Sequence, residues 1–387
     1  MPESVILDPD GLQSLIERLQ ARGYRTIAPT VRRGAVVLAD IAGLADLPRG
    51  VGDEQAPAHY RLRPTEDERL FAFAAPAQSA KAVLFPPDEL LWSGRRTPEG
   101  GFSIEPGEPD GAPIALIGLR GCDLAAIAIH DRVLLGRASV DTHYAQRRRD
   151  AILIAVTCGT PASTCFCSSM GTGPKPGSGA DLTLTELVDP HRFLAEAGTP
   201  RGEELLAALS SRPAGPEDSD AAEAVVAAAV AAMGRALDTE GLPELLSAGA
   251  ESPHWSDVAA RCLACSNCTS VCPTCFCTSI EDVSDLTGEL DERHRVWDSC
   301  FSREYSRLHS GSVRTSVASR YRQWLTHKLG TWSAQFGTAG CVGCGRCITW
   351  CPAGIDLTEE VASLRELAAA AAGRSDTVPT DSDVLED

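Results

Sequence analysis

The chain has 387 residues, 43% of them hydrophobic, which is enough for two or three domains with sizeable cores. Its net charge of −18 makes nucleic acid and anionic membranes poor partners. No uncharged apolar run reaches the roughly 18 residues that a membrane span needs, and residues 1–10 are acidic with no apolar signal segment. We therefore expect no membrane span and a cytoplasmic location.

The first hundred residues predict a mixed α/β structure. Asp10 is a candidate cap for a helix with an apolar stripe that begins at Leu12. Residues 35–41 (AVVLADI) and 82–85 are short strand candidates, and the prolines that follow residue 85 would end the second one.

Two later strands are more informative because a cysteine follows each of them. Residues 113–119 (PIALIGL) and 151–156 (AILIAV) are continuous apolar runs, typical of strands buried on both faces. An apolar helix over residues 124–135 follows the first run, and this order predicts parallel pairing. Open α/β sheets bind ligands beyond the carboxyl ends of their strands, where Cys122 and Cys158 would lie.

The next segment leads away from this sheet. Residues 171–179 are rich in glycine but are no dinucleotide fingerprint, because Pro174 and Pro176 would break the helix that must follow. Helices are predicted near residues 205–209 and 221–237, with an acidic, proline-containing linker between them. We therefore expect an α/β domain over residues 1–195 and a helical linker over residues 196–253.

Two cysteine runs carry the clearest chemistry in the chain. Both have the spacing C-x2-C-x2-C-x3-C followed by proline, which is the bacterial ferredoxin signature for two [4Fe–4S] clusters. Zinc is the weaker alternative, because both runs are complete and both end in Cys-Pro. The fourth cysteine of each run normally binds the other cluster. The expected ligand sets are Cys262, Cys265, Cys268 and Cys351 for one cluster, and Cys341, Cys344, Cys347 and Cys272 for the other.

The insert between the two runs is too long for a compact βαββαβ ferredoxin. It carries helical signals at residues 279–285 and, more strongly, at residues 314–329. These favour an α-helical ferredoxin domain over residues 254–355, in which helices present the cysteines. Residues 356–387 are expected to form a helix at 357–372 and an acidic, disordered tail from Ser375.

Seven of the fifteen cysteines lie outside the ferredoxin runs. Four of them come from two loops at one end of the predicted sheet and are candidates for a third [4Fe–4S] cluster: Cys122, Cys158, Cys165 and Cys167. Inert buried thiols are the alternative, and a redox dithiol is less favoured because the spacing is C-x-C.

The other three are Cys275, Cys277 and Cys300. The sequence Thr-Cys-Phe-Cys-Thr at 274–278 echoes Thr-Cys-Phe-Cys-Ser at 164–168. No fourth thiol is left for another four-cysteine cluster, although Asp298 offers an oxygen ligand. We interpret the three thiols as packing groups or as neighbours of the ligands.

These segments carry a family resemblance, which covers most of residues 80–355. They are RGCDL at 120–124, Cys158 with CFCSSMGTGP at 165–174, SRYRQW at 319–324, and the ferredoxin runs. Together they resemble the iron–sulfur β subunit of cytosolic NAD(P)-linked [NiFe] hydrogenases of the sulfhydrogenase type, and an iron–sulfur subunit of anaerobic sulfite reductase is similar. The resemblance implies an electron-transfer subunit between the small and large subunits of a [NiFe] hydrogenase and a flavin-containing NAD(P) subunit.

The chain lacks other redox motifs. It has no NAD(P) or flavin fingerprint, no paired C-x2-C nickel ligands and no sirohaem pattern. We therefore expect substrate turnover on partner chains and no catalytic residue here. A stand-alone sulfur-reducing enzyme and a sulfite reductase subunit remain the alternatives. Arg261 and Arg346 lie beside ligands, where a positive charge would raise the potential of a cluster, but we interpret both as solvated. Lysine occurs only at positions 81, 175 and 328, which we ascribe to base composition.

Overall fold

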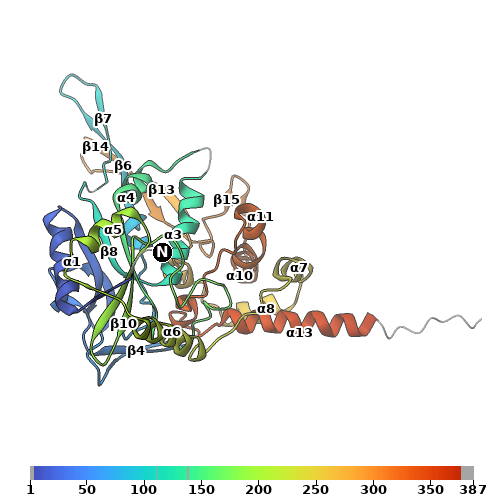
Figure 1. Cartoon of the computed structure of the whole chain (residues 1–387). Coiled ribbons are helices and arrows are strands. Elements are labelled where there is room, and N and C mark those ends of the chain that lie inside the picture. The colour runs from blue at the N-terminus through green and yellow to red at the C-terminus, as the bar shows by residue number, and fades with distance from the viewer. Residues whose placement is uncertain (1–3, 110, 137–138, 376–387) are drawn as a thin grey trace, which may run out of the picture.

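The computed structural model describes residues 4–109, 111–136 and 139–375 (Figure 1). Its largest element is an eight-stranded sheet with the order β12-β1-β11-β10-β9-β8-β2-β3. The strands β2, β8, β9 and β10 pair in parallel, and the outer pairs are antiparallel. The strands are β1 (Val5–Leu7), β2 (Arg25–Arg32), β3 (Ala35–Asp40), β8 (Ile114–Leu119), β9 (Ile152–Val156), β10 (Leu182–Leu187), β11 (Arg192–Ala197) and β12 (Arg212–Pro213).

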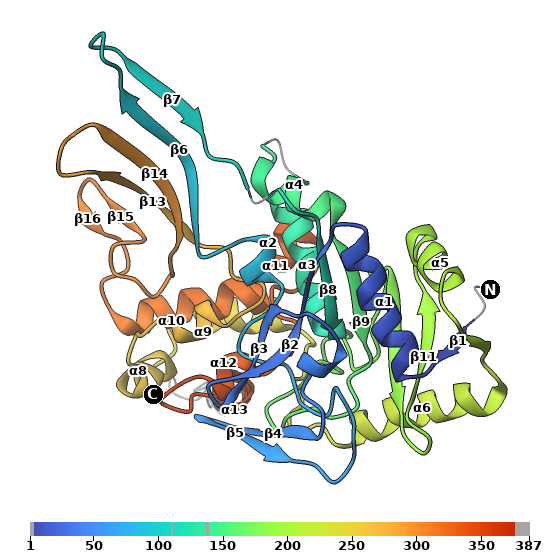
Figure 2. The same cartoon turned by 90° about the vertical axis from the view of Figure 1, so that its left-hand side faces the viewer.

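The two apolar runs form β8 and β9 and pair in parallel, as the sequence predicts. Every residue of both strands is buried, because helices cover both faces of the sheet (Figure 2). Alternate residues of the strands pack into two different cores. One core includes α1 (Pro9–Ala21) and α5 (Pro200–Ala207), and the other includes α2 (Lys81–Leu84), α3 (Gly121–Leu134) and α4 (Thr142–Asp150).

Two local expectations about this region are wrong. The cap of α1 is Asp8 and not Asp10: its Oδ1 accepts a hydrogen bond of 2.8 Å from the backbone N–H of Gly11. Residues 82–84 belong to α2, Phe85 caps that helix, and the segment is no strand. A four-residue apolar run has too few positions for its periodicity to separate a strand from a helical turn.

A second sheet joins two distant parts of the chain. It is antiparallel, with the order β13-β14-β6-β7, and it projects from the body of the molecule (Figure 2). Its strands are β6 (Asp88–Arg96), β7 (Phe102–Pro106), β13 (Thr278–Ser284) and β14 (Leu290–Trp297). The predicted helix at 279–285 is therefore wrong. This segment is extended because it pairs with β14, which in turn pairs with β6, a partner that local sequence does not reveal.

The rest of the chain is mainly helical. The signal at 314–329 corresponds to α10 and the π-helical segment η2, and the predicted C-terminal helix is α13. The predicted helix at 221–237 lies earlier, as α6. These elements are α6 (Pro216–Ala231), α7 (Leu242–Ala248), α8 (His254–Arg261), α9 (Asn267–Ser270), α10 (Val317–Thr326), η2 (His327–Thr331), α11 (Trp332–Phe336), α12 (Arg346–Thr349) and α13 (Leu357–Ser375).

The ferredoxin segment is thus not purely helical. Its core is formed by α7, α8, α10, η2 and α13, while its insert supplies β13 and β14 to the second sheet. Short pieces complete the fold: the 3-10 turn η1 (Leu44–Asp46), the hairpin β4 (Val51–Ala56) with β5 (His59–Pro64), and the hairpin β15 (Arg307–Leu308) with β16 (Gly311–Ser312). No helix among the described residues has the length and apolarity of a bilayer span. The expected tail beyond residue 375 lies outside the described residues.

Candidate iron–sulfur sites

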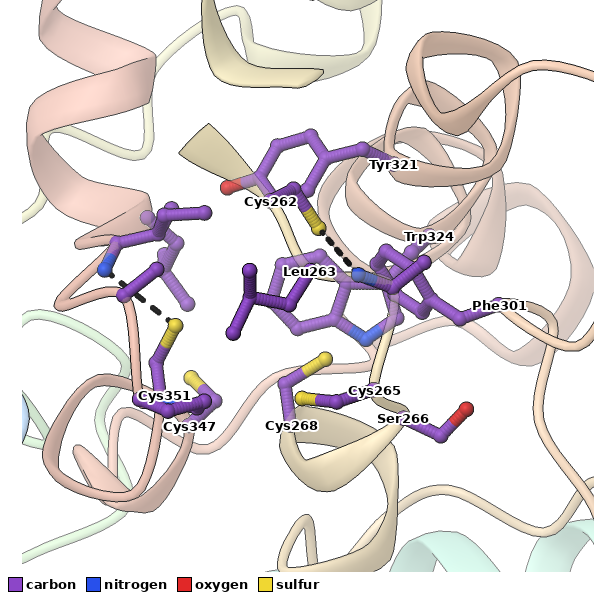
Figure 3. A pocket seen from close by; sticks show the side chains of 15 residues that line it. Cys262, Leu263, Cys265, Ser266, Cys268, Phe301, Tyr321, Trp324, Cys347 and Cys351 are labelled. Carbon is purple, nitrogen blue, oxygen red and sulfur yellow. Dashed lines mark hydrogen bonds between the residues drawn. The ribbon is translucent and has the colours of Figure 1, made fainter. Parts of the chain in front are cut away.

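The first predicted ligand set surrounds one apolar pocket (Figure 3). Cys262 lies at the end of α8, Cys268 lies in α9, and Cys351 follows α12. Cys351 comes from the second run, so the structure brings the crossed set together. The pocket is lined by Cys262, Cys265, Cys268 and Cys351, with Leu263, Phe301, Tyr321, Trp324 and Ile355 among its other walls.

Backbone N–H groups point at two of these sulfurs. Ala264 N–H donates to the Sγ of Cys262 and Ile355 N–H donates to the Sγ of Cys351, both at 3.4 Å. Such bonds stabilise thiolate charge and raise the reduction potential of a bound cluster. Apolar walls around sulfur ligands with N–H donors fit an iron–sulfur group, and Cys265 is the one member of the set that is exposed.

The second predicted set gathers around a buried lysine. Burial raises the pKa of Cys341 to about 12 and that of Cys347 well above its usual value, and the neighbouring thiols, Cys272 among them, add to both shifts. Lys328, in η2, places its Nζ 3.1 Å from the Sγ of Cys272. Cys344 belongs to the same group. Its thiol adds to the raised pKa values of Cys341 and Cys347, and the Cys272 thiol adds to the raised pKa of Cys344.

The third predicted set lies where the sheet topology places it. Cys122 opens α3 directly after β8, Cys158 follows β9, and all four thiols are buried. After burial, the pKa of Cys165 is raised chiefly by Cys158 and Cys167, and that of Cys122 is raised in part by Cys167. The structure therefore brings together Cys122, Cys158, Cys165 and Cys167.

The segment at residues 171–174 closes over this set. Thr172 N–H donates to the carbonyl of Cys167 at 3.0 Å, and Cys158 N–H donates to the carbonyl of Pro174 at 3.1 Å. A Cβ on Gly173 would stand 3.0 Å from the Sγ of Cys167, so a side chain there would press on the thiol. The GTGP motif thus acts as a backbone cover.

A single loop, residues 341–347, carries three cysteines of the second set and reaches both the first and the third set. Cys347 lines the pocket of the first set, and Cys344 contributes to the pKa shifts of Cys122, Cys165 and Cys167. The loop at 341–347 rests on the backbone of residues 164–167: Cβ atoms on Gly343 or Gly345 would meet carbonyl oxygens at 2.6 or 2.5 Å. Both glycines also have positive φ, so close approach and conformation each require glycine.

A buried ion pair connects the α/β region to this loop. Arg346 is fully buried, and its Nη2 lies 2.8 Å from Asp123 Oδ1. Burial opposes the charge of Arg346, but Asp123 and the thiols of Cys344 and Cys122 more than offset it and raise its pKa. The expectation that Arg346 is solvated is therefore wrong. Arg261 is half exposed and pairs with Glu360 at 2.7 Å.

Arg120 of the RGCD motif is also buried, and its guanidinium donates to the carbonyls of Phe71, Phe73 and Thr157. It holds the turn between β8 and α3 that presents Cys122. Sequence reasoning used this motif only for its resemblance and missed both buried arginines. Two signals in the sequence could have revealed them: Asp123 directly after Cys122, and Arg346 inside the second cysteine run.

Cys275, Cys277 and Cys300 lie near the second set. The Cys272 and Cys275 thiols hydrogen-bond to each other, as do those of Cys277 and Cys300, and these bonds lower the pKa values of Cys272 and Cys277. Among the described residues, no three His, Cys, Asp or Glu side chains converge on one point as the ligands of a single ion would. This holds for the ferredoxin cysteines too, and the ligands of a four-iron cluster would stand further apart than those of a single ion.

Comparison with known proteins supports iron–sulfur binding by the ferredoxin segment. A family model described as a 4Fe-4S dicluster domain matches residues 261–355. The sulfhydrogenase 2 subunit beta of Pyrococcus furiosus is 32% identical over 264 residues, which span 67% of this chain and 76% of that protein. No solved structure matches the chain.

Proposed function

Because the chain belongs to the family of sulfhydrogenase β subunits, as an iron–sulfur electron-transfer subunit, we propose that it relays electrons between the small and large subunits of a [NiFe] hydrogenase and a flavin- and NAD(P)-binding subunit. The [4Fe–4S] clusters supply one-electron chemistry when bound. The chain's own residues hold the clusters, order them and keep water away.

The observation that carries this proposal is the arrangement of the loop at 341–347. Through Cys347 the loop reaches the pocket of the first set, and through Cys344 it reaches the third set. Three successive ligand sets connect the outer face of the ferredoxin segment with the carboxyl edge of the parallel sheet. A storage or structural role for clusters would not require such continuity.

The ligands that we propose are Cys262, Cys265, Cys268 and Cys351 for the first cluster, Cys341, Cys344, Cys347 and Cys272 for the second, and Cys122, Cys158, Cys165 and Cys167 for the third. Burial of the third set supports it, because burial raises the pKa values of Cys122, Cys165 and Cys167, which would otherwise be protonated in an apolar environment. Iron binding replaces those protons and couples assembly to folding.

The test uses the complex of this chain with a hydrogenase small and large pair and a flavoprotein subunit. The complex should reduce NAD(P)+ with H2. A Cys165→Ser/Cys167→Ser variant should lose this coupled reaction, whereas H2-dependent and NAD(P)H-dependent dye reduction should each continue. The isolated chain should turn over neither H2, NAD(P)H, sulfite nor polysulfide. Partner-free turnover of any of them would establish a stand-alone enzyme instead, and coupling only to sulfite would assign the chain to a sulfite reductase.

A further inference from the structure

Two of the three cysteines that the relay does not use, Cys275 and Cys277, line one cavity near the base of the projecting sheet. This cavity has a volume of about 240 Å³ and is lined by Lys81, Cys275, Cys277, Trp297 and Asp298, together with residues of α9. Cys300 stands behind Cys277, within hydrogen-bonding reach of its thiol. Asp298 is held in the wall, since its backbone N–H donates to the carbonyl of Cys277 at 2.8 Å.

We propose that Cys275, Cys277 and Cys300, with Asp298 as an oxygen ligand, hold a further iron–sulfur cluster that has three thiolate ligands. Soft thiolates at short spacing select iron–sulfur groups, and a carboxylate can complete such a set. Cys272 stays with the second set. The site adds a branch next to the proposed relay, and its test does not depend on the relay.

The first support is the repeated Thr-Cys-Phe-Cys sequence, both copies of which contact the loop at 340–347. In the first copy Thr164 and Phe166 are buried, and Phe166 N–H donates to the carbonyl of Gly343 at 2.8 Å. In the second copy Thr274 is fully buried, and its hydroxyl donates to the carbonyl of Gly340 at 2.7 Å. Each copy is therefore anchored to the loop at 340–347 beside its two cysteines, by a backbone N–H in the first copy and by a threonine hydroxyl in the second.

The second support is a buried ammonium without a carboxylate partner. Lys81 is buried, and its Nζ donates to the carbonyls of Thr269 and Ser270 at 3.3 and 3.1 Å and lies 3.8 Å from the centre of the Trp297 ring. No ion pair from Lys81 to a described carboxylate is present. A buried charge requires a partner of opposite sign, and the nearest candidates are the thiols of Cys275, Cys272 and Cys277.

The third support is the choice of residue. The chain has lysine at only three positions, and two of these, Lys81 and Lys328, are buried against this group of thiols. A lysine provides a compact charge on a flexible stem, whereas arginine presents a wide fork. Two buried point charges suit a compact anionic group such as a thiolate-bound cluster, and both of them act on thiols of the second set and of the proposed site.

The experiment uses the full chain, reconstituted anaerobically, with iron and sulfide counted per chain. Wild type should bind about sixteen irons, and Cys277→Ser and Cys300→Ser should each lower the count by about four. Tyr305→Phe is the matched control, because the Tyr305 hydroxyl contacts the same Cys277 thiol without being a thiolate ligand. Its iron count should equal that of wild type.

A spectroscopic arm separates a ligand from a structural residue. In wild type, Mössbauer spectra should show one iron with an oxygen ligand, and mild oxidation should release it and give a three-iron EPR signal. Asp298→Cys should keep the iron count and abolish both signatures. This arm also decides the matter if the serine variants do not fold.

Three outcomes would overturn the proposal. The first is an iron count that Cys277→Ser and Cys300→Ser leave unchanged, together with only all-thiolate iron in the wild-type spectra. The second is zinc at the site by metal analysis, and the third is a Cys277–Cys300 disulfide that forms on oxidation with no loss of iron. If Cys165→Ser/Cys167→Ser lost iron and Cys277→Ser did not, the proposed relay would still stand and only this further site would be refuted.

Discussion

The first and the third ligand set, at the outer and the inner end of the series of cysteines, consist of the same residue type in different environments. At the outer end, the first set lines an apolar pocket, and Cys265 is exposed to solvent. At the inner end, the four thiols of the third set are all buried under the backbone cover at 171–174. Reduction potential depends on solvent exposure and on hydrogen bonds to sulfur, so the fold can separate the two ends without changing the ligand type. In the proposed relay, the first set would therefore exchange electrons with a partner and the third set would be insulated.

The largest effect should come from the crossed ligand. Cys351→Ser removes the only member of the first set that the second run supplies, so the outer cluster should be lost. The ferredoxin segment should also be destabilised, because cluster binding and folding are coupled. Iron analysis and Mössbauer spectra of the reconstituted chain measure both. If the spectra instead changed only for the cluster of Cys341, Cys344 and Cys347, the crossed assignment would be wrong.

The next effect tests the inner end by itself. Cys165→Ser/Cys167→Ser should remove about four irons, because thiolates are the ligands, and leave the outer cluster unchanged. The cysteines of the third set lie beyond the ends of β8 and β9, so the strands themselves are unchanged and the variant should retain most of its circular dichroism spectrum. Ser168→Ala, next to the same loop cysteines, is the control and should bind as much iron as wild type. An unchanged iron count in the double variant would remove the third cluster from the relay.

A smaller effect should follow from breaking the buried ion pair. Arg346→Met leaves Asp123 charged and buried without its partner, which should cost about 3–5 kcal/mol of unfolding free energy. The double variant Arg346→Met/Asp123→Leu should recover much of this loss, because neither charge is then left alone. Denaturant unfolding of the anaerobic holoprotein, followed by circular dichroism, measures both. Equal losses in the two variants would show that the pair is not the source of the stability.

The smallest effect concerns the arginine beside the outer end. Arg261 is about half exposed, so solvent screens its charge, and its buried partner Glu360 keeps a second partner in His254 at 2.8 Å. Arg261→Gln should therefore cost at most about 1 kcal/mol and leave the iron content unchanged. The same unfolding assay measures it, with Arg365→Gln as a second partly exposed arginine for reference. A loss as large as that of Arg346→Met would contradict the contrast between the two ends.

The parts of the fold that were predictable are those that local sequence encodes. The apolar runs at 113–119 and 151–156 are long enough to mark buried strands, and their topology places Cys122 and Cys158 at one edge. The spacing of the ferredoxin runs likewise grouped Cys262, Cys265, Cys268 and Cys351, which line one pocket together with Cys347. In both cases the chemistry follows from neighbours in the chain.

The parts that were missed depend on distant partners. Residues 279–285 carry a helical signal but are extended, because β6, nearly two hundred residues earlier in the chain, completes the sheet in which their hairpin lies. An arginine is ordinarily expected at the surface, and only the packing of Arg346 against Asp123 shows that it is buried. The scarcity of lysine was visible from the start, yet its meaning required the positions of Lys81 and Lys328.

The projecting sheet has a consequence for how this protein can be divided. Two of its strands, β6 and β7, come from the α/β part, and the other two, β13 and β14, come from the ferredoxin insert. The pairing of β14 with β6 fastens the two parts to each other along their backbones. Excising residues 254–355 would uncover a strand edge on each fragment, and uncovered edges promote aggregation. The cluster-binding segment is therefore not an interchangeable cassette, and a graft onto another protein would have to carry β6 with it.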